Sequence, residues 1–320
     1  MTNEAIRSVC SPTALSSACF KHWVLNGGGH EKNEMRRLVN RLPVTRIKIF
    51  IARLLYRLVH LVFRRDQRII TRKGITYEID LSEGIDLAVF LFGSFQKHVF
   101  CNKRLSLHRD AVIVDVGANF GMMTLQFAKI APSGKIYAFE PTHYAFSKLS
   151  KNLRLNPDLA ERIIAVQSFV SSTTSEQVDM KAHASWKVGG ASGEIRHGIH
   201  GGTVKSAEGV GAVSLDDFCQ TNDICRVDLI KIDTDGYELE VLMGAKRIIA
   251  GFRPAVIFEI GLYILEEMNV SFSDYLEFFG PLNYSLLDSS SFARIEQSNY
   301  CKYIPSKATI DILALPTPHS

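Results

Sequence analysis

Residues 112–121 read VIVDVGANFG. An apolar run typical of a buried β-strand leads to Asp115, and Gly117 and Gly121 follow before a helical pattern begins near Phe120. Glycine lets the backbone turn sharply and approach a bound ligand closely. This strand–turn–helix pattern is typical of the first unit of a doubly wound α/β sheet that binds a nucleoside-bearing cofactor.

Further short apolar runs follow this stretch, and most of them are separated by helical patterns. Nearly continuous apolar strands with helical links indicate an α/β fold with a buried parallel sheet. The last two runs lack a helix between them, so we expect an antiparallel pair at one edge of the sheet. The predicted strands are 111–116, 135–140, 162–167, 227–233, 254–260, 283–288 and 308–314.

Length and composition are those of a globular protein. The 320 residues are 46% hydrophobic and 22% charged, which excludes a wholly disordered, collagen-like or disulfide-scaffold chain. The six cysteines form no CxxC pair and no secretory signal is apparent. We therefore expect reduced thiols in a cytoplasmic protein, with peripheral membrane contact as an alternative.

Positive charge is concentrated near the start of the chain. Residues 36–73 contain twelve Lys or Arg and one acid, Asp66, although the whole chain has a net charge of only +4. Residues 47–63 have helical periodicity. The basic face contains Arg46, Arg53, Arg57, His60 and Arg64, and the apolar face contains Ile47, Ile51, Leu54, Leu55, Leu58 and Val62.

Two interpretations of this basic helix are open. Residues 46–73 could lie in the interface of an anionic membrane, with arginines toward the headgroups, or the helix could pack on the core of its own domain with a solvated basic face. Few aromatic residues separate the charges, which argues against a nucleic-acid interface.

The sequence divides into three segments. Residues 1–35 lack periodicity and predict a mobile tail, residues 36–73 predict a basic amphipathic helical extension, and residues 74–316 form the main α/β domain. Within that domain, residues 171–212 are rich in Ser and Gly and poor in apolar residues. Such a long stretch without clear elements predicts an insert or lid over the site.

The cofactor is inferred from the ends of the first two strands. Glu140 ends the second strand, where an acid accepts hydrogen bonds from ribose hydroxyls. The turn from Gly117 through Asn119 to Gly121 lacks the third glycine of a dinucleotide site, and the Asp115 carboxylate would repel a pyrophosphate. We therefore expect these five residues to bind S-adenosylmethionine, which is cationic and carries no phosphate. An NAD-dependent oxidoreductase or epimerase is the alternative.

Acids also end two later strands. Asp233 closes the strand in DLIKIDTDGYELEVLMGA (228–245), and Glu259 ends the neighbouring strand. We expect these two carboxylates to flank the cleft opposite the methyl donor. Asp235 and Glu238 open the following helix, where its dipole favours carboxylates without any catalytic role.

Taken together, these motifs resemble the FkbM-type methyltransferases that use S-adenosylmethionine. The resemblance implies a class I methyltransferase fold, a seven-stranded, mostly parallel sheet with one antiparallel strand and helices on both faces. It also implies O-methylation of hydroxyls on sugars, glycolipids or secondary metabolites. Asp235 stands where the family often has Glu, and His143 where it often has Pro. The matching stretches are YEIDLSEGID (77–86), IVDVGANFG (113–121), FEP (139–141), NLRLNP (152–157), VSLDDF (213–218) and IKIDTDGYELEVLMGA (230–245).

O-Methylation requires that the acceptor hydroxyl lose its proton, so a base or a metal must assist. Asp233 is the first candidate base, Glu259 the second and His143 the third. A divalent ion bridging Asp233 and Glu259 is an open alternative, although no HxxxH or similar ligand spacing supports it. Through the VSLDDF match, Asp216 is placed near the cofactor, and a helix N-cap is its alternative role. An inactive, membrane-docking module is a further alternative for the whole chain.

Overall fold

The fold is described from a computed structural model that places residues 45–178, 180, 182–183, 188 and 204–317. The predicted tail at 1–35 and residues 189–203 of the predicted insert lie outside the described residues.

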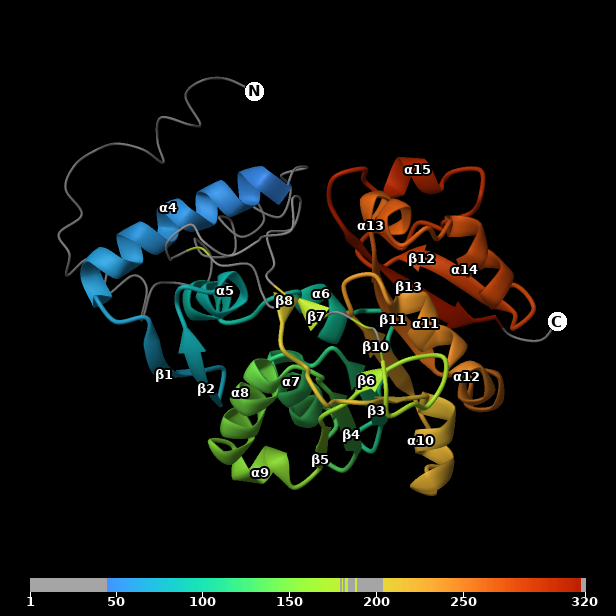
Figure 1. The fold of residues 1–320 in the computed structure, drawn as a ribbon, viewed down its shortest axis with the longest axis horizontal. Coiled ribbons are helices and arrows are strands. Elements are labelled where there is room, and N and C mark those ends of the chain that lie inside the picture. Colours follow the sequence, from blue (N-terminus) through green and yellow to red (C-terminus); the bar gives the residue numbers. More distant parts are fainter. Residues whose placement is uncertain (1–44, 179, 181, 184–187, 189–203, 318–320) are drawn as a thin grey trace.

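A seven-stranded sheet organises the described chain (Figure 1). Its strands, in spatial order, are β12 (Tyr284–Asp288), β13 (Ile310–Pro316), β11 (Ala255–Ile260), β10 (Leu229–Ile232), β3 (Val112–Val116), β4 (Lys135–Phe139) and β5 (Ile163–Val166). The five strands from β11 to β5 are parallel, and β13 runs antiparallel to both β11 and β12. The predicted edge pair and the class I methyltransferase topology are both confirmed.

The strand order reverses between β3 and β10. β3 pairs with β4 on one side and with β10 on the other, so the chain leaves β3 in one direction and returns to the opposite side. In doubly wound sheets ligands bind at such a switch point, outside the carboxyl ends of the strands. The topology therefore places a binding crevice beyond Val116 and Ile232.

Helices cover both faces of the sheet, as predicted. One apolar core joins strand residues such as Ile113 and Ile136 to α5, α7 and α8, and a second joins Val114 and Phe258 to helices of the other face. The first group comprises α5 (Gly84–Phe92), α6 (Lys97–Phe100), α7 (Met122–Ile130), α8 (His143–Arg154) and α9 (Pro157–Ala160). The second comprises α10 (Leu215–Thr221), α11 (Glu238–Met243), α12 (Lys246–Phe252), α13 (Leu262–Glu267) and α14 (Phe272–Phe279). A short helix, α15 (Tyr300–Tyr303), lies between β12 and β13 in the chain.

A separate hairpin precedes the sheet. It consists of β1 (Gln67–Arg72) and β2 (Ile75–Asp80), follows helix α4 (Thr45–Phe63), and turns at Lys73–Gly74. Two amides of the NLRLNP motif hold it: the side-chain oxygen of Asn152 accepts from the Glu78 N–H at 2.7 Å, and that of Asn156 accepts from the Thr76 N–H at 2.8 Å. These asparagines therefore join the hairpin to the main domain.

The described part of residues 171–212 contains only short pairings. β6 (Phe169–Val170), just before it, pairs parallel with β9 (Ala212–Val213). β7 (Ala182–His183) pairs antiparallel with β8 (Val204–Lys205), and so brings the two ends of the segment together.

The helical stretch that follows β10 is divided in two. α11 ends at Met243 and α12 begins at Lys246. A Cβ on Gly244 would lie 2.0 Å from the Ser171 carbonyl oxygen, so the backbone there packs directly on a neighbouring loop. This tight contact accompanies the break.

Candidate active site

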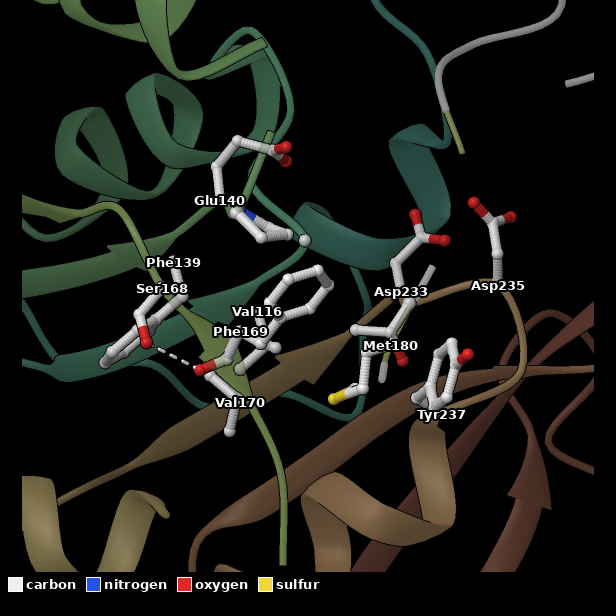
Figure 2. A pocket seen from close by; sticks show the side chains of 13 residues that line it. Val116, Phe139, Glu140, Ser168, Phe169, Val170, Met180, Asp233, Asp235 and Tyr237 are labelled. Carbon is white, nitrogen blue, oxygen red and sulfur yellow. Dashed lines mark hydrogen bonds between the residues drawn. The ribbon is translucent and has the colours of Figure 1, made fainter. Parts of the chain in front are cut away.

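A cavity opens at the carboxyl ends of β3, β4 and β10 (Figure 2). The space between its walls, including the open mouth, is about 460 Å³. Gly117, Glu140, Asp233 and Asp235 line it, together with Met180 from the 171–212 segment. Three of the predicted site residues, Gly117, Glu140 and Asp233, thus surround one cavity.

Gly117 is needed for the shape of the cavity wall. Its φ is +75°, a left-handed conformation, and a Cβ there would lie 1.9 Å from the Asp233 carbonyl oxygen. The N–H groups of Gly117 and Ala118 both donate to the Phe139 carbonyl, at 3.0 and 2.9 Å. The loop is therefore fastened to β4 and β10, with bare backbone facing the cavity.

Glu140 has the geometry expected of a ribose-binding acid. Its Oε1 accepts hydrogen bonds from the Thr142 N–H and hydroxyl, and its Oε2 accepts from the Asn119 N–H at 2.9 Å. Burial raises its pKa, while these donors and Lys231 oppose that shift. A carboxylate oxygen accepts about two hydrogen bonds, so Oε2 retains capacity for a ligand hydroxyl.

Asp115 lies elsewhere than the sequence predicted. Its side chain is fully buried within β3 and does not line the cavity. One carboxylate oxygen accepts from the Thr124 hydroxyl at 2.6 Å, and the other lies 3.1 Å from Lys231 Nζ. The carboxylate points into the packed interior behind the cavity, where it pairs with Lys231 of the neighbouring strand, and its contact with the cofactor stays a prediction.

Asn119 and Gly121 also support the loop without lining the cavity. The Asn119 side-chain oxygen accepts from the Phe120 N–H at 2.8 Å, and its backbone holds Glu140. Gly121 has φ +86° at the start of α7, where a Cβ would lie 2.5 Å from a methyl carbon of Leu149. Both residues shape the turn that contains Gly117, and their predicted contact with the cofactor stays a prediction.

Two acids from one loop face the cavity together. Asp233 directly follows β10, and Asp235 lies two residues further with φ +53° (Figure 2). The Glu238 carboxylate holds this loop by accepting from the Thr234 and Gly236 N–H groups, at 2.9 and 3.0 Å. Glu238 is thus a buried structural residue, but Asp235, which the sequence assigned to the helix dipole, belongs to the cavity.

The charges around Asp233 and Asp235 affect the pKa values of the two carboxyl groups differently. Lys231 Nζ lies 3.7 Å from the Asp233 carboxylate and favours its ionised form, although burial still raises the pKa of Asp233. Burial raises the pKa of Asp235 to about 8, with help from the negative charges of Asp233, Glu238 and Glu140. A carboxyl group with a pKa near neutrality is suited to proton transfer.

We expect the free energy of unfolding of the Asp235→Asn variant to decrease less with rising pH than that of the wild type. Since folding raises this pKa from 3.8 to about 8, the contribution of the carboxyl group is fully present below about pH 3.8 and lost as the pH rises through about 8. Partial solvent screening limits the effect to the order of 1 kcal/mol. Urea unfolding of both proteins at about pH 5 and about pH 9 measures it, and identical pH slopes would contradict the environment described for Asp235.

Glu259 lies beside the cavity rather than in its lining. Its Oε1 accepts from the Thr309 hydroxyl at 2.7 Å, and the residue pairs in register with Asp311 of β13. Burial, then the charges of Asp233 and Asp311, raise the pKa of Glu259 well above its usual range. Asp311 in turn contacts His98 Nε2 at 2.5 Å. Glu259 therefore belongs to a carboxylate network behind Asp233.

His143 has both ring nitrogens engaged outside the cavity. Gln167 Nε2 lies 2.8 Å from Nδ1, and Nε2 lies 3.1 Å from the Glu208 carbonyl oxygen. If Gln167 donates to Nδ1, His143 donates from Nε2 and has no lone pair left to accept a proton. In this structure His143 links α8 to the 206–208 loop, and its role as a base stays a prediction.

Asp216 is also remote from the cavity lining. Its carboxylate oxygens accept from the backbone N–H groups of Arg247 and Ile248, both at 2.9 Å, at the beginning of α12. Asp216 therefore caps a helix, which was the alternative role considered for it. The capped helix is α12, not α10, which contains Asp216 itself. Its predicted contact with the cofactor stays a prediction.

The metal alternative finds no ligand set in the described part of the chain. Across those residues, no group of three or more His, Cys, Asp or Glu side chains is arranged to hold a metal ion. Asp233 and Glu259, the predicted bridging pair, belong instead to the network that contains Lys231, Thr309 and Asp311.

Three residues that contribute to the site were not predicted as site residues from the sequence: Lys231, Asp235 and Met180. Lys231 is almost completely buried in β10 and contacts both Asp115 and Asp233. A lysine inside an otherwise apolar strand was the available signal, because buried lysines require a partner. Asp235 and Met180 carried no comparable signal, since both sit in loops whose path depends on tertiary packing.

Comparison with known proteins identifies one domain family and several curated relatives. A family model described as the methyltransferase FkbM domain matches residues 115–286, more than half of the chain. Methyltransferase sdnD from Sordaria araneosa is 30% identical over 169 residues, which are 45% of this chain and 64% of that protein. The hexuronic acid methyltransferase AglP from Haloferax volcanii is 24% identical over 135 residues, 42% of this chain and 50% of that protein. The chain thus aligns with less than two thirds of either relative.

Among solved structures, the chain is similar to the crystal structure of methyltransferase FkbM from Methylobacillus flagellatus. The sequence identity is 17% and the TM-score is 0.43, and the superposition covers 71% of this chain and 52% of the other.

Proposed function

Because this chain belongs to the FkbM methyltransferase family, we propose that it transfers a methyl group from S-adenosylmethionine to a hydroxyl oxygen of a sugar, a glycolipid or a secondary metabolite. The observation that carries the proposal is the cavity between Gly117, Glu140 and the acidic loop at 233–235. The name of one relative, a hexuronic acid methyltransferase, supports a sugar acceptor.

The cavity fits a cationic adenosyl cofactor. Gly117 lines the cavity without a side chain, and Glu140 retains acceptor capacity for ribose hydroxyls. The Asp233 carboxylate, whose ionised form Lys231 favours, adds negative charge, which favours a ligand with a sulfonium and an ammonium group. When bound, S-adenosylmethionine supplies a methyl group on a positively charged sulfur, which departs as a neutral thioether.

The chain's own task is then to prepare the acceptor oxygen. Asp235 is the preferred base, because its raised pKa lets the carboxylate take a proton effectively near neutral pH. The proton of the hydroxyl passes to the Asp235 carboxylate as the oxygen lone pair forms the new bond to carbon. Asp233, the first candidate from sequence, lies beside Lys231 and is therefore the weaker base of the two.

The oxidoreductase alternative is disfavoured by the same charges. A dinucleotide pyrophosphate needs backbone N–H groups or cations directed at it. Here three carboxylates line the cavity, and the nearby cation, Lys231, is almost completely buried and engaged with Asp115. The inactive-module alternative is disfavoured because Glu140 is held by the Asn119 N–H and the loop that carries Asp233 and Asp235 is held by the Glu238 carboxylate.

Glu140→Gln is expected to weaken S-adenosylhomocysteine binding about 10- to 100-fold, the effect of losing hydrogen bonds to a charged acceptor. Isothermal titration calorimetry measures the affinity. Asp216→Asn is the matched control, because Asp216 is an acid outside the cavity lining. It should lower thermal stability and leave the affinity unchanged. If the wild type and the Glu140→Gln variant bound S-adenosylhomocysteine with equal affinity, Glu140 would not be a cofactor-binding residue.

A further inference from the structure

An exposed apolar row runs along the outer side of α4. Phe50, Leu54, Leu58 and Leu61 are 69%, 51%, 43% and 74% exposed. Their spacing of three or four residues aligns them on one side of the helix. Single exposed apolar side chains are common on proteins, whereas a contiguous row of them marks an interaction surface. We call these four residues the outer apolar row.

The inner side of α4 is fixed to the domain. Val59 is fully buried, and Leu55 and Phe63 pack against the core. The Phe63 ring meets that of Phe90 in α5 edge-to-face, with ring centroids 5.3 Å apart. Figure 1 shows α4 alongside α5 at the periphery of the molecule. The single apolar face predicted from sequence is thus divided, with one part packed inward and Leu54 and Leu58 among those facing outward.

Basic side chains accompany the outer apolar row. Arg53 and Arg57 are exposed and immediately precede two of its leucines, and the exposed Arg64 and Arg65 follow the end of α4. The helix itself contains no acidic residue. The nearest acid along the chain, Asp66, is engaged by side chains of α4. This surface therefore combines apolar contact area with a uniformly positive border.

We propose that this side of α4 docks the protein on the surface of a bilayer that contains anionic lipids. A helix that lies in the interface presents apolar residues to the acyl boundary and Arg to the headgroups, which is the arrangement seen here. No helix in the described ranges is long and apolar enough to cross a membrane. Docking along the helix is therefore the membrane contact that this surface offers, and it does not depend on the proposed methyl transfer.

Vesicle co-sedimentation of the full chain tests the proposal. Wild type should bind vesicles of phosphatidylcholine mixed with phosphatidylglycerol and lose binding as salt is added, but should not bind phosphatidylcholine alone. Arg53→Gln with Arg57→Gln should lower the affinity about 25-fold, about fivefold for each charge. Leu54→Glu with Leu58→Glu should lower it about 100-fold, because two buried leucines are lost.

Two control variants test whether vesicle binding depends on this surface or on any exposed apolar or basic side chain. Met243→Glu replaces an apolar side chain that is 49% exposed on α11, and Arg109→Gln removes an exposed arginine outside the α4 region. Both should bind anionic vesicles as wild type does. The proposal is overturned if the wild type does not bind anionic vesicles, or if the variant with Leu54→Glu and Leu58→Glu binds them as well as the wild type does. It is also overturned if sedimentation equilibrium shows a dimer that the leucine pair dissociates, since a second copy would then cover the row.

Discussion

Asp235→Asn is expected to lower kcat by a factor of about 10² to 10⁴, the contribution of a positioned general base. An amide has nearly the same shape but cannot accept the hydroxyl proton. In the wild type, activity should rise with pH until the Asp235 carboxyl is ionised, near its pKa of about 8, and level off above it. Below that pH the group is protonated and cannot act as a base.

Transfer of labelled methyl groups to a hexuronic acid acceptor, the substrate class named for one relative, measures this effect. At about pH 7 the affinity for S-adenosylhomocysteine should stay within about twofold of wild type, because Asp235, with its pKa of about 8, is then largely uncharged and the amide has nearly the same volume. Glu240→Gln, an exposed acid on α11, is the matched control and should keep full activity. If Asp233→Asn abolished turnover while Asp235→Asn retained it, the base would be Asp233, as the sequence first suggested.

Asp115→Ala is expected to destabilise the protein by about 3 kcal/mol or more, because it removes one partner of a buried ion pair. Lys231 would keep only the carboxylate of Asp233 at 3.7 Å and the Val116 and Gly117 carbonyls. The Thr124 hydroxyl would also lose its acceptor. Urea unfolding gives the change in free energy.

The double variant Asp115→Ala with Lys231→Met distinguishes a structural role from a ligand contact. It removes both buried charges, so it should recover much of the lost stability. Asp115→Ala alone should weaken S-adenosylhomocysteine binding only as far as the loop at Gly117 loses its support. If Asp115→Ala instead kept the stability of the wild type and bound S-adenosylhomocysteine much more weakly, Asp115 would contact the cofactor directly, as its position in the sequence suggested.

Sequence patterns predicted the sheet well because strand identity depends on local composition. The apolar runs at 111–116, 227–233 and 254–260 became β3, β10 and β11 with shifts of one or two residues at their ends. The binding edge followed from topology, since parallel strands carry their carboxyl ends to one side of the sheet. Gly117, Glu140 and Asp233 could therefore be placed around one cavity without coordinates.

The direction in which side chains point was not available from the sequence. Asp115 was predicted at a strand tip, but it lies one residue before the end of β3 and points to the interior, because successive residues of a strand face opposite sides. Lys231 neutralises it there from the neighbouring strand. Asp216 and His143 likewise found partners distant in sequence, at α12 and at Glu208. Such pairings depend on tertiary packing, which a motif does not encode.

The division of α4 into two apolar sides has a similar cause. Its periodicity is compatible with either a membrane or a protein neighbour, and the structure shows a protein neighbour on the inner side and an exposed row on the outer side. Periodicity shows that a helix is amphipathic, whereas contact with α5 decides which residues are covered.

Calorimetric titration of the full chain with S-adenosylhomocysteine and, separately, with NAD is the most direct test of the site. If Gly117 and Glu140 enclose an adenosyl methyl donor, the first ligand binds with a stoichiometry near one and the second gives no heat of binding. Saturable heat with NAD, together with none from S-adenosylhomocysteine, would contradict the account.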